Sequence, residues 1–84
     1  MTRLLFFGRL RDVAGGSERS LALPPEIGTV RELRAWIGAD HVALAEALNA
    51  GAVRVAIDQV MCVDDDASVR GAVEIAFMPP LSGG

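Results

Sequence analysis

Lysine is missing from this chain of 84 residues, and its eight basic residues are all arginine. Tyrosine is also missing, while cysteine, histidine and tryptophan occur once each. A single cysteine excludes an internal disulfide, and without lysine no side-chain amine is available for joining to a carboxyl group. With one histidine and one cysteine, the sequence shows no set of nucleophile, base and orienting group for catalysis.

Clustered positive charge and long apolar runs are lacking as well. The net charge of −3 and the sequence pI of about 4.9 argue against a nucleic-acid partner and favour a protein partner with a basic surface. No stretch approaches the roughly 18 apolar residues of a membrane span, and the N-terminus lacks the pattern of a signal peptide. We therefore expect a cytoplasmic protein with neither a membrane nor a nucleic-acid partner.

Length and composition predict one small domain. With 51% hydrophobic and 23% charged residues, the chain has enough apolar material for one core and no signature of disorder. We place the folded domain at residues 1–80 and a flexible tail at residues 81–84.

Apolar periodicity predicts five strands and three helices. Short apolar or alternating runs indicate strands at residues 2–7, 19–23, 53–58, 60–63 and 73–78. Helical spacing indicates helices at residues 9–14, 29–38 and 40–49, which end at Gly15-Gly16, Gly38 and Gly51.

The two later helices have recognisable start signals. Thr29 and Glu32 have the spacing of a capping box, and Asp40 is the expected N-cap of the next helix. The side chains expected to face inward from these helices are Val30, Leu33, Trp36, Ile37, Val42, Ala45 and Leu48.

This order of elements predicts an α+β roll of the β-grasp, ubiquitin-like kind. Such a roll has a mixed sheet of about five strands, with the helices on one face. The first and last strands would lie side by side and parallel at the sheet centre, and the first two strands would pair as a widened hairpin.

Strand alternation predicts which side chains face the helices and which face outward. Facing the helices we expect Leu4, Phe6, Val73, Ile75 and Phe77. Facing outward we expect Leu5, Phe7, Ala76 and Met78. Phe7 and Met78 would then form an apolar outer patch where the chain leaves the last strand. Met61 would join them only if the turn at residues 58–60 preserves the alternation, which the sequence leaves open.

Cys62 and His41 are more typical of structural residues than of catalytic ones. A persulfide on Cys62 is the alternative, but a reactive thiolate needs nearby positive charge, and three aspartates follow at residues 64–66. These aspartates lack the glycine and distal glutamate of a calcium loop, so we interpret them as a solvated turn and expect no metal site. The sequence also lacks a phosphate-binding glycine motif, so we expect no stably bound cofactor.

The chain ends in the segment Met78-Pro79-Pro80-Leu81-Ser82-Gly83-Gly84. The prolines favour an extended exit, and the four residues after them can reach about 13 Å. Glycines lack a Cβ atom, so the last two could enter a narrow channel of another protein; the alternative is a frayed end. The terminal carboxylate is ionised and a poor electrophile at neutral pH, so acyl chemistry on it requires activation from outside.

Three segments of the chain carry a family resemblance. They are Leu4-Leu5-Phe6-Phe7-Gly8 with the following Arg9-Leu10-Arg11-Asp12-Val13-Ala14-Gly15, Val55-Ala56-Ile57-Asp58-Gln59, and Ile75-Ala76-Phe77-Met78-Pro79-Pro80-Leu81-Ser82-Gly83-Gly84. Together they resemble the MoaD family, the small subunit of molybdopterin synthase, essentially from end to end. The Phe-Phe-Gly start combined with the Phe-Met-Pro-Pro-x-x-Gly-Gly finish is more specific than the Gly-Gly end, which ubiquitin-like carriers share.

The resemblance implies a sulfur carrier that has no catalytic residues of its own. Gly84 would be adenylated by a MoeB-like, ATP-dependent activating enzyme and converted to a thiocarboxylate by a sulfur donor, so that AMP and sulfur are held only transiently. It would then enter a MoaE-like large subunit, within a heterotetramer, and donate sulfur to cyclic pyranopterin monophosphate to build the dithiolene of molybdopterin. The active-site residues would belong to that partner.

Partner contacts are expected from the outer patch and the tail. The residues concerned are Phe7, Met61, Met78, Pro79, Pro80, Leu81, Ser82, Gly83 and Gly84. Two alternatives share such a tail: a sulfur carrier for another pathway, such as thiamine or cysteine synthesis, and a ubiquitin-like modifier that is conjugated to lysines.

Overall fold

The structure, a computed structural model, describes residues 1–50, 53–62 and 64–79. Its elements are β1 (Thr2–Phe6), α1 (Arg9–Ala14), β2 (Glu18–Leu21), α2 (Val30–Gly38), α3 (Val42–Asn49), β3 (Arg54–Ile57), β4 (Val60–Met61) and β5 (Glu74–Met78). Every predicted element is present, although β2 ends two residues earlier than expected, before Pro24. The expected helix stop at Gly51 and strand residue Val63 lie outside the described residues.

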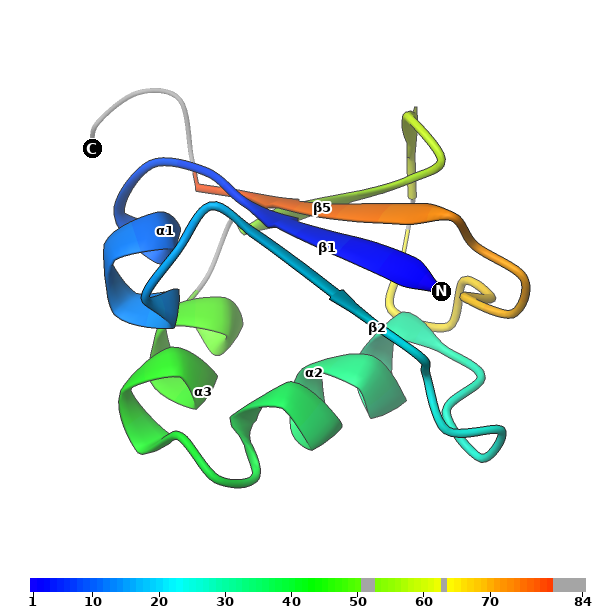
Figure 1. Cartoon of the computed structure of the whole chain (residues 1–84), viewed down its shortest axis with the longest axis horizontal. Helices are drawn as coiled ribbons and strands as arrows, with labels where there is room; N and C mark the ends of the chain where they lie inside the picture. Colours follow the sequence, from blue (N-terminus) through cyan, green and yellow to red (C-terminus); the bar gives the residue numbers. More distant parts are fainter. Residues whose placement is uncertain (51–52, 63, 80–84) are drawn as a thin grey trace.

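The five strands form one mixed sheet in the order β2-β1-β5-β3-β4. β1 and β5 are parallel, and the other neighbouring pairs are antiparallel. Figure 1 shows the helices gathered on one side of the sheet, with α2 and α3 lying beneath it. The predicted α+β roll, its parallel central pair and its widened first hairpin are therefore confirmed.

The core lies between this face of the sheet and the helices. Leu4 is paired with Ile75 and Phe6 with Phe77 across the two central strands, and all four side chains are buried. The rings of Phe6 and Phe77 stack with their centroids 5.5 Å apart. Burying each large apolar side chain contributes about 1.5–3 kcal/mol, so this central block is a principal source of stability. In the described part of the chain, no helix has the length and apolar character needed to cross a bilayer.

The predicted capping box at the start of α2 is confirmed. The hydroxyl of Thr29 accepts from the N–H of Glu32 at 3.2 Å, while the Glu32 carboxylate accepts from the N–H groups of Gly28 at 2.8 Å and Thr29 at 3.1 Å. The hydrogen bond from the N–H of Gly28 is the main cause that holds the pKa of Glu32 below its ordinary value. Burial opposes this effect, and the hydrogen bonds with Thr29 add to it.

Three side chains predicted to face inward are instead on the surface. Trp36 is 37% exposed because the buried stripe of α2 is narrow, and Trp36 lies beside it. Val42 is 73% exposed because it is the first residue of α3 and lies off the buried side, which is formed by Leu44 and Leu48. The N-cap of α3 is His41, one residue after the expected Asp40. Val73 is 60% exposed because it precedes β5, so the alternation of that strand does not extend to it.

The turn between β3 and β4 decides the orientation of Met61. Asp58 and Gln59 form a two-residue connection in which both have positive φ, 49° and 70°. Such a turn matches the twist of a hairpin and keeps the strands in simple register. Met61 is consequently paired with Ala56 and shares the outward face of the sheet.

Replacing Glu32 with glutamine tests the capping box. Because the pKa of Glu32 is lowered by folding, its carboxylate adds stability above its unfolded-state pKa, and this contribution is lost as the pH falls through the folded-state pKa. The free energy of unfolding of Glu32→Gln should therefore lie below that of the wild type at about pH 7, and the difference should narrow toward about pH 3. Urea denaturation at both pH values measures this difference in the free energy of unfolding. Glu46→Gln, on the exposed side of α3, is the control. An equal difference at both pH values would contradict the role of the charge.

Candidate functional site

The candidate site lies where β5 passes into the tail. β5 is the central strand of the sheet, and its last residue, Met78, is opposite Arg54 at the start of β3. Pro79, which is half-buried, follows it directly. The predicted site residues Pro80, Leu81, Ser82, Gly83 and Gly84 lie outside the described residues, so their role stays a prediction.

The segment after β1 lies against this exit. The N–H of Phe7 donates to the carbonyl oxygen of Phe77 at 3.1 Å, which continues the parallel pairing by one residue. Gly8 follows with a φ of +58°, and a Cβ atom placed on it would lie only 2.7 Å from Cγ of Pro79. The Phe-Phe-Gly start is therefore in direct contact with Phe77 and Pro79, near the other end of the sequence. Sequence reasoning singled out both segments but missed the contact between Gly8 and Pro79.

An apolar area covers the outward face of the sheet beside the exit. A row of paired residues crosses this face, formed by Leu5, Ala76, Ala56 and Met61. Phe7 and Met61 are 48% and 45% exposed, and Met78 is half-buried. We call Leu5, Phe7, Met61 and Met78 the outer-face patch. Ala76 belongs to the same face by alternation, as predicted, but its small side chain is covered by its neighbours and is buried.

Charged groups border the outer-face patch. Arg54 is exposed opposite Met78, and farther along the same face Arg3 forms an ion pair with Glu74 at 3.0 Å. Asp58 is engaged within the protein, since its Oδ1 accepts from the N–H groups of both Val73 and Glu74 at 2.9 Å. The Asp58 carboxylate therefore anchors the start of β5 to the β3–β4 turn.

The lone cysteine and histidine have structural surroundings. Cys62 is half-buried and packs against the core, and its N–H pairs with the carbonyl oxygen of Val55 at 3.0 Å. Burial, followed by the nearby charge of Asp65, raises the pKa of the Cys62 thiol, so the thiol stays protonated at neutral pH. Nδ1 of His41 accepts from the N–H of Leu44 at 3.2 Å, which caps α3.

The aspartates at 64–66 do more than form a solvated turn. Asp65 pairs with Arg34 at 3.3 Å, Asp66 pairs with Arg31, and Oδ1 of Asp64 accepts from the N–H of Asp66 at 2.9 Å. These contacts fasten the turn to α2. Over residues 1–50, 53–62 and 64–79, no group of three or more His, Cys, Asp or Glu side chains is arranged to hold a metal ion.

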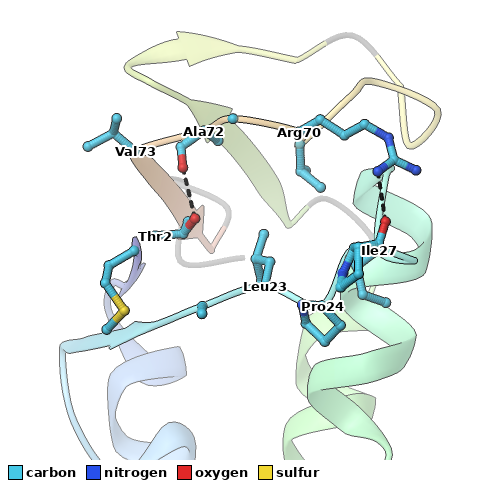
Figure 2. A pocket seen from close by; sticks show the side chains of 12 residues that line it. Thr2, Leu23, Pro24, Ile27, Arg70, Ala72 and Val73 are labelled. Carbon is cyan, nitrogen blue, oxygen red and sulfur yellow. Dashed lines mark hydrogen bonds between the residues drawn. The ribbon is translucent and has the colours of Figure 1, made fainter.

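A hollow of about 430 Å³ lies at the opposite end of the central strands, where β1 and β5 begin. Figure 2 shows two hydrogen bonds at its rim, from the hydroxyl of Thr2 to the carbonyl oxygen of Ala72 at 2.8 Å and from Arg70 to that of Pro25 at 2.7 Å. Because these polar groups are already paired and the hollow lies at the other end of β5 from Met78, we do not assign it to the candidate site.

Comparisons with known proteins agree with this architecture. Residues 4–84 match the model of the ThiS family. The molybdopterin synthase sulfur carrier subunit of Escherichia coli (strain K12) is 32% identical over 84 residues, 100% of each chain, and the protein of the same name from Haemophilus influenzae is 31% identical over the same length. The crystal structure of SAMP1 from Haloferax volcanii, at 22% identity, superposes with a TM-score of 0.74 over 99% of this chain and 98% of that one, which shows a shared fold. The chain therefore belongs to the ThiS family, and its full-length similarity to two sulfur carrier subunits confirms the MoaD-family resemblance.

Proposed function

We propose that this chain is the sulfur carrier subunit of a molybdopterin synthase and that the Gly84 carboxylate carries the sulfur. The observation that carries the proposal is the match, over the full length of both chains, to two proteins of that name. The fold is consistent with it, because the central strand β5 leads directly toward the Gly-Gly end. The protonated Cys62 thiol favours the carboxylate over a cysteine persulfide as the sulfur-bearing group.

Loading the carboxylate requires two steps on an activating enzyme of the MoeB kind. A carboxylate oxygen of Gly84 attacks the α-phosphorus of ATP, and pyrophosphate leaves, which gives an acyl adenylate. A hydrosulfide equivalent from a sulfur donor then adds to the carbonyl carbon, and AMP leaves, which gives a thiocarboxylate. The partner enzyme supplies the nucleotide site, and this chain supplies the carboxylate as a substrate.

Delivery takes place in a large subunit of the MoaE kind. The thiocarboxylate sulfur forms a carbon–sulfur bond at a carbon of cyclic pyranopterin monophosphate, while a carbon–oxygen bond at that carbon breaks and its oxygen leaves with a proton. Water then cleaves the acyl–sulfur bond, which leaves the sulfur on the pterin and restores the carboxylate. Because a dithiolene contains two sulfur atoms, two loaded carriers are consumed for each product molecule. The catalytic residues belong to the large subunit, with which this chain forms a heterotetramer.

The outer-face patch is the proposed docking surface for these partners. It is apolar, lies beside the exit of the tail, and includes two methionines, whose flexible side chains adapt to different partner surfaces. The lack of lysine suits the same role, since the chain has no side-chain amine that could capture its own activated carbonyl.

Mass spectrometry tests the loading step. The chain incubated with a MoeB-like enzyme, ATP and a sulfide donor should gain about 16 Da, the difference between sulfur and oxygen. A variant that lacks Gly84 should show no gain while keeping its melting temperature, because a terminal residue beyond the folded domain contributes little to the core. No gain in the wild type with any candidate activator would overturn the proposal.

The acceptor is tested with the loaded carrier. Conversion of cyclic pyranopterin monophosphate in the presence of a MoaE-like subunit supports the proposal. Loading without this conversion would point to thiamine or cysteine synthesis, and conjugates on lysines of other proteins would point to a modifier.

Replacing Phe7 with alanine tests the docking surface. Since the Phe7 side chain is half exposed, Phe7→Ala should lower the free energy of unfolding by less than about 1.5 kcal/mol. It should raise the Kd for the large subunit at least about tenfold, because a truncated aromatic anchor is costly in an interface. Trp36→Ala is the matched control, since Trp36 is similarly exposed but lies on α2, on the helical side of the sheet. Titration calorimetry measures the Kd of each variant for the large subunit, and urea denaturation measures its free energy of unfolding. Equal effects of the two variants on the Kd would contradict the assignment of the docking surface.

A further inference from the structure

Gly8 occupies a backbone conformation that other residues rarely adopt. It lies between β1 and α1 with φ +58° and ψ −137°, and its carbonyl oxygen accepts from the N–H of Arg11 at 3.1 Å. This region of φ and ψ is accessible almost only to glycine. The first turn of α1 therefore begins in a defined position immediately after the central strand β1.

The space beside the Gly8 Cα atom is filled by the ring of Pro79. A Cβ atom on residue 8 would lie 2.7 Å from Cγ, 3.5 Å from Cδ and 3.9 Å from Cβ of Pro79. The first of these distances is far shorter than the contact of about 3.5–4.0 Å between unbonded carbon atoms. Pro79 is held on its other side by covalent connection to Met78, whose strand is paired with both β1 and β3.

We propose that Gly8 is a positioning residue: its missing side chain seats the Pro79 ring and so sets the direction in which the chain leaves the sheet. This inference rests on the proposed function, in which the carboxylate at the chain end must reach a reaction centre in a partner enzyme. Five residues separate Pro79 from that carboxylate, a reach of about 16 Å. Once the predicted flexible tail is extended in a partner's channel, a rotation of about 10° at Pro79 would move its end by about 3 Å, whereas a misplacement of about 1 Å can lower a reaction rate about a hundredfold.

The same short helix offers a matched control. Gly15, at the other end of α1, also has a positive φ, +83°, but a Cβ atom placed on it would have nothing within 4 Å. A substitution at Gly15 therefore introduces backbone strain at α1 without touching Pro79. If Gly8 acts specifically through Pro79, a substitution at Gly8 should lower the kcat of thiocarboxylation, and a substitution at Gly15 should not.

The test compares Gly8→Val with Gly15→Val in steady-state thiocarboxylation by the activating enzyme, with the carrier concentration varied. For Gly8→Val we expect kcat to fall about tenfold and KM to change less than about twofold, because docking through the outer-face patch is kept while the carboxylate is misplaced. Gly15→Val should leave both constants near those of the wild type. Gly8→Ala, the milder variant, should show a smaller decrease in kcat. It replaces Gly8→Val in the test if Gly8→Val does not fold.

Removing the Pro79 ring provides the rescue. Pro79→Ala deletes Cγ and Cδ, the two atoms closest to the added Cβ, so the double variant Gly8→Ala/Pro79→Ala should regain a kcat close to that of Pro79→Ala alone. A purely structural role of Gly8 would give no rescue. Unchanged kcat in folded Gly8 variants, or equal losses at Gly8 and Gly15, would overturn the inference.

A second measurement separates this inference from the proposed function. If the wild-type chain is not thiocarboxylated, the proposed function fails, and the effect of Gly8 is then measured on the isolated carrier by NMR. Amide chemical shifts of residues 81–84 that change in Gly8→Ala but not in Gly15→Ala support the positioning role. Shifts that are the same in both variants overturn it.

Discussion

The parallel pairing of β1 with β5 is the interaction on which the rest of the structure depends. It joins the first and the last described strands of the chain, so the entropy of closing almost the whole sequence into a loop must be offset at this one place. The stacked rings of Phe6 and Phe77 and the buried pair Leu4 and Ile75 provide the compensating burial. Because the pair is parallel, the turn after β1 and the exit of β5 lie at the same end of the sheet, which brings Gly8 against Pro79.

The described side chains divide into those that build the fold and those left exposed for a partner. Three titratable groups have structural roles or surroundings: His41 caps α3, Asp58 anchors β5, and burial keeps the Cys62 thiol protonated. Phe7 and Met61 remain exposed on the opposite face of the sheet. This division agrees with a carrier whose own reacting group is a terminal carboxylate and whose catalytic machinery belongs to other proteins.

Local patterns predicted much of the fold, and their failures have a common cause. The capping box at Thr29 and the glycine stop at Gly15 depend only on neighbouring residues, and both are present. Trp36 and Val42 were wrongly placed because apolar periodicity shows that a helix has a buried stripe but not how wide it is or in which phase it meets the sheet. Val42 lies two residues before the buried Leu44, about 200° around the helix from it, so it cannot share the buried side of α3.

The sequence by itself determined the order of the elements, the alternation of the two central strands, the absence of lysine and the presence of an apolar strand that leads to Gly-Gly. Each of these is a local or compositional property. Only the tertiary structure decided that Met61 shares the outward face, because that depends on the positive φ angles of Asp58 and Gln59. The contact of Gly8 with Pro79 was likewise decided there, since it exists only after two distant segments have met in one register across the sheet.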